Sequence, residues 1–204
     1  KDSKAIQLIT LDPGHFHAAL VQKTMYPDVD SVVQVYAPEG SDLQLHLGRI
    51  DAFNTRAKDP TRCKEEVYTG DDYFEKMLAD KKGNTVMLSG NNEKKTEYII
   101  RSLEAGLNVL ADKPMVINSA GFETLKKAFE TAKQKNLMLY DIMTERFEIT
   151  TALQRELSMI PEIFGELEKG TPEHPAITKE SVHHFYKYVS GNVLTRPAWF
   201  MDVS

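Results

Sequence analysis

Cysteine is almost absent from this sequence of 204 residues, which contains only Cys63. A single thiol excludes an intrachain disulfide framework and a cluster of thiolate metal ligands. Long hydrophobic runs are also absent, since no apolar stretch reaches the roughly 20 residues that a membrane-spanning helix needs. Lys1 to Lys4 lack the apolar core of a signal peptide. A signal can be removed before this numbering begins, so the compartment, cytoplasmic or exported, stays open.

An excess of positive charge is lacking too. The net charge is −5, which gives no electrostatic reason to expect a nucleic-acid partner. The remaining composition, 41% hydrophobic and 27% charged residues, is ordinary for a folded soluble protein. The length suffices for one complete domain and part of a second one.

Short apolar segments alternate with amphipathic ones along the first 147 residues. Most apolar segments lack the in/out alternation of a half-exposed strand, which favours a parallel sheet covered on both faces. The sequence therefore predicts an α/β fold, a Rossmann-type doubly wound parallel sheet with right-handed crossovers. The predicted strands are 5–10, 31–37, 85–89, 107–111 and 137–142, and the predicted helices are 16–25, 42–53, 73–78, 94–105 and 119–135.

The sequence changes in character after residue 147. Ile149, Leu153 and Leu157 predict one more helix, prolines and glycines then follow at loop spacing, and 181–189 is typical of a strand. We therefore predict two domains. Residues 1–147 form a Rossmann-type domain, and residues 148–204 begin an incomplete α+β second domain.

Ligands of such sheets bind beyond the carboxyl ends of the strands. The first turn is the usual phosphate site, where glycines let backbone N–H groups approach a pyrophosphate. Only Gly14 remains here of the G-x-G-x-x-G pattern, with Asp12 and His17 at its outer positions. Two interpretations stay open: Gly14, His15 and Phe16 hold phosphates through backbone groups, or the turn is an ordinary strand–helix connection.

The second strand normally ends in an acid that hydrogen-bonds the adenosine ribose. Ala37 stands at that position, and Glu39 follows two residues later. Glu39 either binds the ribose or is a solvated loop carboxylate. No arginine follows it directly, which favours NAD over NADP.

Lys113 is the most specific candidate for catalysis. It follows a predicted central strand and precedes a proline, in the segment Ala111-Asp112-Lys113-Pro114. An ammonium group there can donate to a substrate oxygen and stabilise the charge that develops during hydride transfer. The alternative is a helix-entry turn with an exposed lysine.

Residues 85–146 resemble the glucose–fructose oxidoreductase and inositol dehydrogenase family, Gfo/Idh/MocA. The matching segments are TVMLSGNN, SLEAGLNVLADKPMVIN and LMLYDIMTERF. The resemblance implies that Lys113 lies beside the nicotinamide and substrate, with Asp112 at the family's glutamate position, and that the bond to Pro114 is often cis. It also implies that Ser89, Gly90 and Asn91 line the cofactor. A lysine, Lys94 or Lys95, stands where the family commonly has a histidine.

The resemblance also implies that residues 1–147 bind NAD(P) and that residues 148–204 begin a domain for substrate binding and oligomerisation. The tail carries the resemblance further. Phe164-Gly165-Glu166-Leu167 is similar to the start of the family's second domain, and Arg196-Pro197-Ala198-Trp199 is similar to its R-x-x-W segment. Trp199 either packs near the cofactor or belongs to the core. The family's catalytic histidine and aspartate are expected beyond Ser204, so the 204-residue chain is expected to lack the usual base.

Other polar residues leave alternatives open. Arg146 either contacts cofactor or substrate or pairs with Glu145. The neighbours His183 and His184 would point to opposite faces of a strand. For His15 and His17 no third ligand is visible, so no metal site is predicted. His15 is expected near the pyrophosphate or substrate, and His17 in packing.

The sequence thus favours an NAD(P)-dependent oxidoreductase that acts on CH–OH groups, with NAD as cofactor and a sugar or cyclitol as substrate. Relatives lead us to expect a homo-oligomer for the full-length protein. One alternative is a non-catalytic dinucleotide-binding module, favoured by the altered glycine turn. Another is an NAD-dependent glycoside-cleaving enzyme of the same family.

Overall fold

The structure, a computed structural model, describes residues 5–142, 147–178, 186–189, 192–196 and 198–201. Two compact units divide the chain: residues 1–142 together with 197–204, and residues 143–196. The first unit contains a six-stranded sheet in the order β3-β2-β1-β4-β5-β6, in which every neighbouring pair is parallel. The predicted Rossmann-type α/β fold is confirmed. The strands are β1 (Leu8–Leu11), β2 (Val32–Tyr36), β3 (Lys64–Tyr68), β4 (Thr85–Leu88), β5 (Asn108–Ala111) and β6 (Leu139–Asp141).

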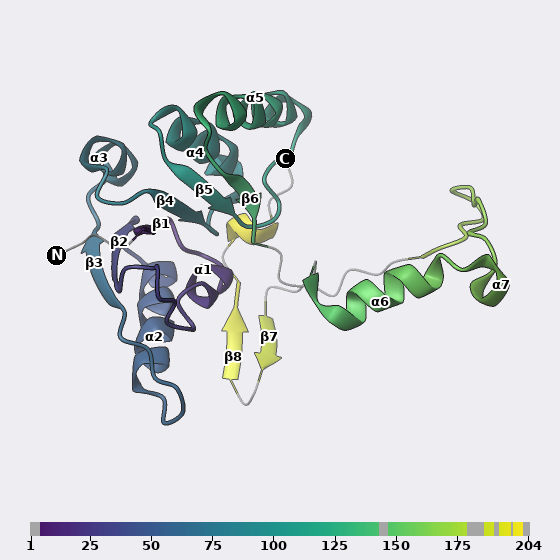
Figure 1. The fold of residues 1–204 in the computed structure, drawn as a ribbon, viewed down its shortest axis with the longest axis horizontal. Coiled ribbons are helices and arrows are strands. Elements are labelled where there is room, and N and C mark those ends of the chain that lie inside the picture. The colour runs from purple at the N-terminus through teal and green to yellow at the C-terminus, as the bar shows by residue number, and fades with distance from the viewer. Residues whose placement is uncertain (1–4, 143–146, 179–185, 190–191, 197, 202–204) are drawn as a thin grey trace. The chain divides into compact units, whose positions relative to one another are not determined.

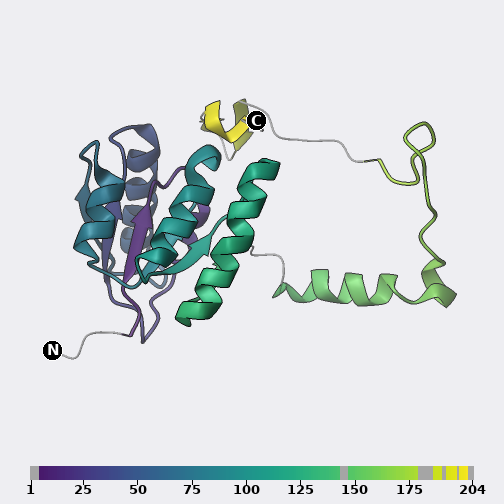
Figure 2. The same cartoon turned by 90° about the horizontal axis from the view of Figure 1, so that it is seen from above.

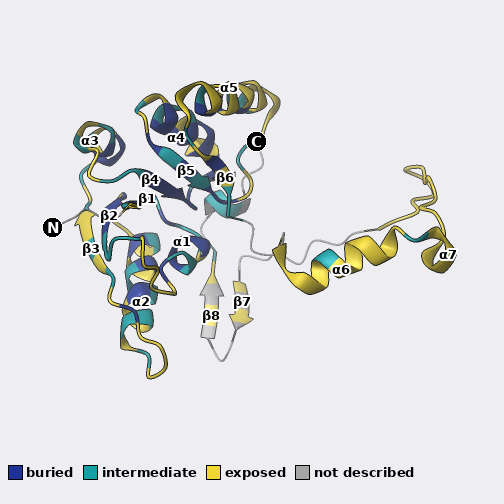
Figure 3. Cartoon of the chain, viewed as in Figure 1, coloured by how far each residue is buried: buried dark blue, intermediate teal, exposed yellow. Residues whose placement is uncertain are grey.

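Helices cover both faces of this sheet, with α1 and α2 on one face and α3, α4 and α5 on the other (Figure 1; Figure 2 gives a second view). All four residues of β1 and of β4 are buried, which explains why their sequences lack alternation (Figure 3). The helices are α1 (His17–Leu20), α2 (Ser41–Thr55), α3 (Tyr73–Asp80), α4 (Asn92–Glu104) and α5 (Ser119–Lys135). Within the described residues, no helix is both long and apolar enough to cross a membrane.

The first helix is much shorter than predicted. The sequence predicts a helix over 16–25, whereas α1 is a single turn. After α1 the backbone hydrogen bonds span three residues: Gln22 N–H donates to Ala19 and Lys23 N–H to Leu20. The Lys23 carbonyl accepts from the Arg56 guanidinium at 2.7 Å. Tertiary bonds therefore replace the helix that the local pattern favours.

Two further elements differ from the sequence prediction. The strand β3 was not predicted, because it lies at the edge of the sheet and carries charged residues: Lys64 and Glu66 are exposed, although Glu65 between them is largely buried. In α5, the apolar residues at helical spacing predict a stripe that includes Phe122 and Phe129, yet these two are exposed, whereas Leu125 and Ala128 are buried. The buried stripe of α5 is thus narrower than its sequence suggests.

The second unit contains α6 (Ile149–Ser158), α7 (Pro161–Phe164) and an antiparallel pair, β7 (Tyr186–Val189) with β8 (Asn192–Thr195). The predicted stripe Ile149, Leu153 and Leu157 does lie on one helix, yet all three side chains are exposed (Figure 3). Of the predicted strand 181–189, residues 186–189 form β7 and the others lie outside the described residues.

Candidate active site

The Asp112-Lys113-Pro114 segment follows β5 directly. The backbone N–H of Asp112 donates to the Leu88 carbonyl at 2.7 Å, which fixes the segment against the end of β4. Asp112 is buried, whereas Lys113 and Pro114 are exposed. The Lys113–Pro114 peptide bond is cis, as the resemblance implies. An exposed ammonium group therefore stands at the carboxyl edge of the sheet, where ligands of open α/β folds bind.

The first turn, between β1 and α1, is fastened to the loop after β4. The backbone N–H groups of Gly14 and His15 both donate to the Ser89 carbonyl, at 3.2 and 2.7 Å. In return, the Ser89 hydroxyl donates to the His15 carbonyl at 2.9 Å. These two N–H groups are the ones predicted to meet a phosphate. A phosphate can bind them only by replacing their hydrogen bonds to Ser89.

Gly90 permits this close approach of the two loops. A Cβ atom on Gly90 would lie 1.7 Å from the carbonyl oxygen of Asp12. Asp12 itself has a φ of 48°, in the left-handed region that aspartate tolerates better than most residues. Its carboxylate accepts a hydrogen bond from Tyr98 Oη on α4 at 3.3 Å, and burial raises the pKa of this carboxyl group. The Asp12 side chain is thus directed to α4.

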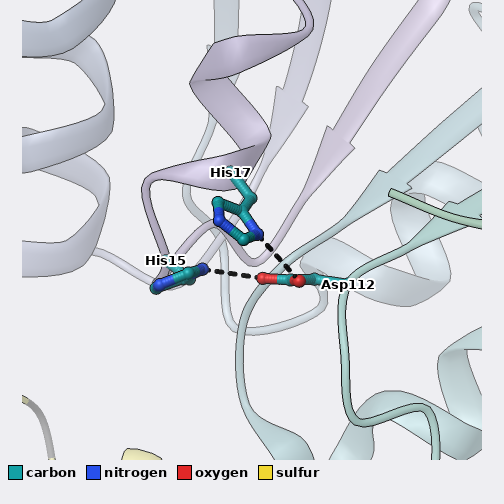
Figure 4. Close-up of side chains that lie close together, drawn as sticks. All are labelled: His15, His17 and Asp112. Carbon is teal, nitrogen blue, oxygen red and sulfur yellow. Dashed lines mark hydrogen bonds and ion pairs between the residues drawn. The ribbon is translucent and has the colours of Figure 1, made fainter. Parts of the chain in front are cut away.

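His15 and His17 converge on Asp112 (Figure 4). The Nδ1 atom of His15 lies 2.7 Å from one carboxylate oxygen, and Nδ1 of His17 lies 3.0 Å from the other. The Lys113 backbone N–H also donates to this carboxylate, at 2.8 Å. Sequence analysis missed the cluster: it placed His17 in packing and found no third partner for the two histidines. Asp112 supplies that partner, 95 residues away from His17 in the chain.

The electrostatics of this cluster favour an ionised carboxylate. Burial opposes the ionisation of Asp112, but the hydrogen bonds from His15 and His17 outweigh it and hold the pKa of Asp112 well below its usual value. For His15, burial has the largest influence and lowers the pKa, although Asp112 opposes this shift. With Nδ1–H donating to Asp112, Nε2 of a neutral imidazole is left as an acceptor.

Lys95 is a buried cation beside this cluster. Its side chain is only 2% exposed, and its ammonium group donates to Asn92 Oδ1 at 3.0 Å. Burial lowers the pKa of Lys95 to about 8, although attraction to Asp112 raises it in part. The neighbouring Lys94 is exposed. The two lysines that stand near the family's histidine position therefore differ in burial: Lys95 is buried and Lys94 is exposed.

The remaining predicted cofactor residues lie at the ends of several strands. Glu39 is exposed in the loop after β2, which β1 and β4 separate from β5 in the sheet. Ser89 and Gly90 are buried, and Asn91 caps α4 by accepting the Glu93 N–H at 3.0 Å. Phe16 is exposed at the start of α1. The structure thus brings Gly14, His15, Ser89, Gly90 and Asp112 together, whereas Glu39 stands apart from Lys113.

Trp199 lies in the short 3-10 helix η2 (Ala198–Met201) and packs on the first turn. Its indole N–H donates to Asp42 at 3.1 Å, and a Cβ atom on Gly14 would lie 2.2 Å from its ring. Gly14 therefore makes room for the indole. Arg146, predicted to contact the cofactor, lies outside the described residues, as do Glu145, His183 and His184.

A sequence profile described as the oxidoreductase family with an NAD-binding Rossmann fold, Gfo/Idh/MocA, matches residues 14–141. The chain belongs to this family. A second profile, described as "Putative oxidoreductase C terminal domain", matches residues 153–204. No curated protein matches the chain.

Solved structures agree with this family membership. A crystal structure described as a "putative oxidoreductase" from Parabacteroides merdae is 65% identical, with a TM-score of 0.88, over 98% of this chain and 46% of its own length. This chain therefore spans about half of that protein. An NAD-binding protein from Listeria innocua is 22% identical, with a TM-score of 0.54, over 80% of this chain and 42% of its own. Scyllo-inositol dehydrogenase from Lactobacillus casei is 16% identical, with a TM-score of 0.52, over 80% and 44%. The last two show the fold alone.

The strand ends of this Gfo/Idh/MocA domain differ in how open they are to a ligand. Lys113 and Glu39 are exposed, so burial does not prevent either from contacting one. At the first turn, the Gly14 and His15 N–H groups are engaged by Ser89, and an Asp42 carboxylate oxygen lies 3.1 Å from the position of a Cβ atom on Gly14. A pyrophosphate fits here only if the turn exchanges Ser89 for phosphate oxygens.

Proposed function

We propose that the complete protein is an NAD(P)-dependent oxidoreductase that transfers a hydride between nicotinamide and the carbinol carbon of a secondary alcohol, on a sugar or cyclitol. The observation that carries this proposal is the exposed Lys113 at the carboxyl end of β5 in a domain of the Gfo/Idh/MocA family. The sugar-like substrate follows from the family resemblance.

A bound nicotinamide supplies the hydride acceptor at its C4 atom. Lys113 donates a hydrogen bond to the substrate oxygen, and its charge stabilises the negative charge that develops as the hydroxyl proton leaves. We assign the removal of that proton to the histidine and aspartate that the resemblance implies beyond Ser204. The buried Asp112 fixes the start of the segment, because its carboxylate accepts the backbone N–H of Lys113.

For cofactor binding, we propose contacts from every strand end named above. Gly14, His15 and Phe16 would meet the phosphates once the turn releases Ser89, and Glu39 would bind the ribose. Ser89, Gly90, Asn91, Asp112 and Pro114 would line the nicotinamide half, together with Trp199 and Arg146. NAD is the preferred cofactor, since no arginine directly follows Glu39 to meet a 2′-phosphate. Full-length protein is proposed to be a homo-oligomer.

The test measures nicotinamide reduction by the full-length protein with NAD⁺ or NADP⁺ and a panel of sugars and cyclitols. Lys113→Ala is expected to lower kcat by about 10²–10⁴-fold, the range that one positioned acid–base group contributes. Lys126→Ala is the matched control, because Lys126 is an exposed lysine on α5 whose ion pair is with Glu123. NADH fluorescence titration measures cofactor binding separately from turnover.

Three outcomes contradict parts of this proposal. Normal turnover by Lys113→Ala removes Lys113 from the mechanism. Binding of NADH without turnover of any polyol in the panel favours a non-catalytic dinucleotide-binding module. Glycoside cleavage with no net change in nicotinamide favours the NAD-dependent glycoside-cleaving alternative.

A further inference from the structure

The proposed function makes no use of the side chains of His15 and His17. Both imidazoles and the Asp112 carboxylate each offer one possible ligand atom, and these three atoms all lie within 4.8 Å of one another. We propose that His15, His17 and Asp112 bind a divalent transition-metal ion. The proposal does not depend on the dinucleotide chemistry above.

The two distances between a histidine and the carboxylate require only a small adjustment. A zinc ion takes nitrogen and carboxylate ligands at about 2.0–2.2 Å, which sets ligand atoms of a tetrahedral site about 3.3–3.5 Å apart. The two Nδ1 atoms lie 2.7 and 3.0 Å from the oxygens of Asp112 (Figure 4). Opening these pairs by roughly half an ångström makes room for the ion. Each ring then carries its proton on Nε2, since Nδ1 becomes the ligand.

The backbone holds the three ligands in place from two sides. The first turn is tied to Ser89 by three hydrogen bonds, which fix the position of His15. On the other side, the Asp112 N–H is bound to Leu88. His17 and Asp112 are buried, and the His15 side chain is 19% exposed. A set of two histidines and one carboxylate that is anchored in this way resembles the three-ligand sites of metalloenzymes, which leave coordination positions for water or substrate.

The ligand chemistry selects the metal. Imidazole nitrogen suits Zn²⁺, Co²⁺, Ni²⁺ and Fe²⁺, whereas Mg²⁺ and Ca²⁺ prefer oxygen ligands. Two cations lie near the cluster, because Lys95 interacts electrostatically with Asp112 and Lys113 with His15. Their charge weakens the binding of any divalent ion, so we expect a metal that gains most from nitrogen ligands, such as Zn²⁺, and negligible binding of Mg²⁺.

The test is metal titration of the purified chain after removal of metals with a chelator. Calorimetry with Zn²⁺ is expected to give one equivalent per chain, and Co²⁺ is expected to give a visible absorption spectrum with imidazole ligands. His17→Ala and Asp112→Asn are each expected to weaken binding at least about tenfold, since even outer-shell substitutions cost that much. His174→Ala, which removes an exposed histidine of the second unit, is the control and is expected to bind normally.

Because His17 and Asp112 are buried, circular dichroism and thermal unfolding without metal accompany each variant. His15→Ala, at a less buried position, provides the same test with a smaller demand on folding. Absence of Zn²⁺ and Co²⁺ binding in the wild-type chain overturns the proposal and leaves the cluster as a hydrogen-bonded triad. Unchanged binding by folded His15→Ala overturns it as well. Cofactor binding is measured separately, so failure of the metal site leaves the oxidoreductase proposal intact.

Discussion

Lys95 should make the stability of the first unit depend on pH in a way that one substitution removes. Burial lowers the pKa of Lys95 from 10.5 to about 8 in the folded chain. Between these two pKa values, the Lys95 side chain is mostly protonated in the unfolded chain and mostly neutral in the folded chain. The free energy of unfolding therefore rises with pH across this interval. The difference of about 2.5 between these two pKa values corresponds to about 3.5 kcal/mol, at about 1.4 kcal/mol for each pKa unit.

Lys95→Met removes this titration and keeps a long apolar stem. At pH 7 the variant escapes a penalty of about 3.5 kcal/mol. It also leaves Asn92 Oδ1 without its donor, which costs about 1–3 kcal/mol in a buried position. At pH 7 Lys95→Met is therefore expected to be more stable than wild type by about 0.5–2.5 kcal/mol. At pH 10.5 only the cost remains, so wild type is expected to be more stable than Lys95→Met by about 1–3 kcal/mol.

The assay is urea unfolding of wild type and Lys95→Met at pH values from 7 to 10.5, followed by circular dichroism. Tyrosines titrate near the upper limit too, so the informative quantity is the difference between the two proteins at each pH. Lys127→Met, an exposed lysine on α5, is the control and should differ from wild type by a constant amount. A constant difference for Lys95→Met as well would refute the reasoning, because it would show that Lys95 keeps an ordinary pKa.

Three further perturbations test the fold and the loops of the candidate site. Gly90→Ala is expected to destabilise the chain by several kcal/mol and to weaken cofactor binding, because its Cβ would meet the Asp12 carbonyl. The control is Gly48→Ala, in open space on α2, which should stabilise the chain by about 0.5–1 kcal/mol. Equal urea midpoints for the two variants would contradict this prediction. Ile99→Ala, at a fully buried position on α4, should cost about 2–5 kcal/mol in urea unfolding, and a loss below about 1 kcal/mol would show that the site collapses. The Glu148 carboxylate accepts hydrogen bonds from Thr150 and Thr151, which lowers its pKa to about 2. The helicity of α6, measured by circular dichroism, should therefore persist above pH 4.5 and fall as the pH is lowered toward 2. Glu148→Gln should abolish this pH dependence.

Local patterns predict the buried strands well and the edge of the sheet poorly. The segments that became β1, β2, β4 and β5 are short, apolar and bounded by turn residues, so their burial on both faces is visible in the sequence. The strand β3 pairs with one neighbour only, and its residues Lys64 and Glu66 are exposed to solvent. Nothing in a window of five residues distinguishes such a strand from a polar loop.

The residues of the candidate site also differ in how far the sequence alone could predict them. Lys113 and its cis bond to Pro114 belong to a contiguous segment, so sequence reasoning could single them out. The cluster of His15, His17 and Asp112 joins residues from the ends of β1 and β5, which lie on either side of β4 in the sheet. Strand order would have to be known before that contact could be predicted. The H-x-H spacing of His15 and His17 was the available signal, and it identifies two of the three proposed metal ligands.

The first turn shows most clearly why the local pattern is insufficient. Its segment Asp12-Pro13-Gly14-His15 departs from a glycine-rich phosphate loop, but glycine content alone does not set the ability of a turn to bind an anion. What decides that ability is where the N–H groups of Gly14 and His15 point, and both are bonded to a carbonyl that follows β4. The same bonds that occupy these donors also hold His15 against Asp112. The turn therefore has no free N–H group at Gly14 or His15 for an anion, but it holds the two imidazoles in fixed positions where a cation can bind. Ser89, which accepts both hydrogen bonds, lies 75 residues from Gly14 in the chain.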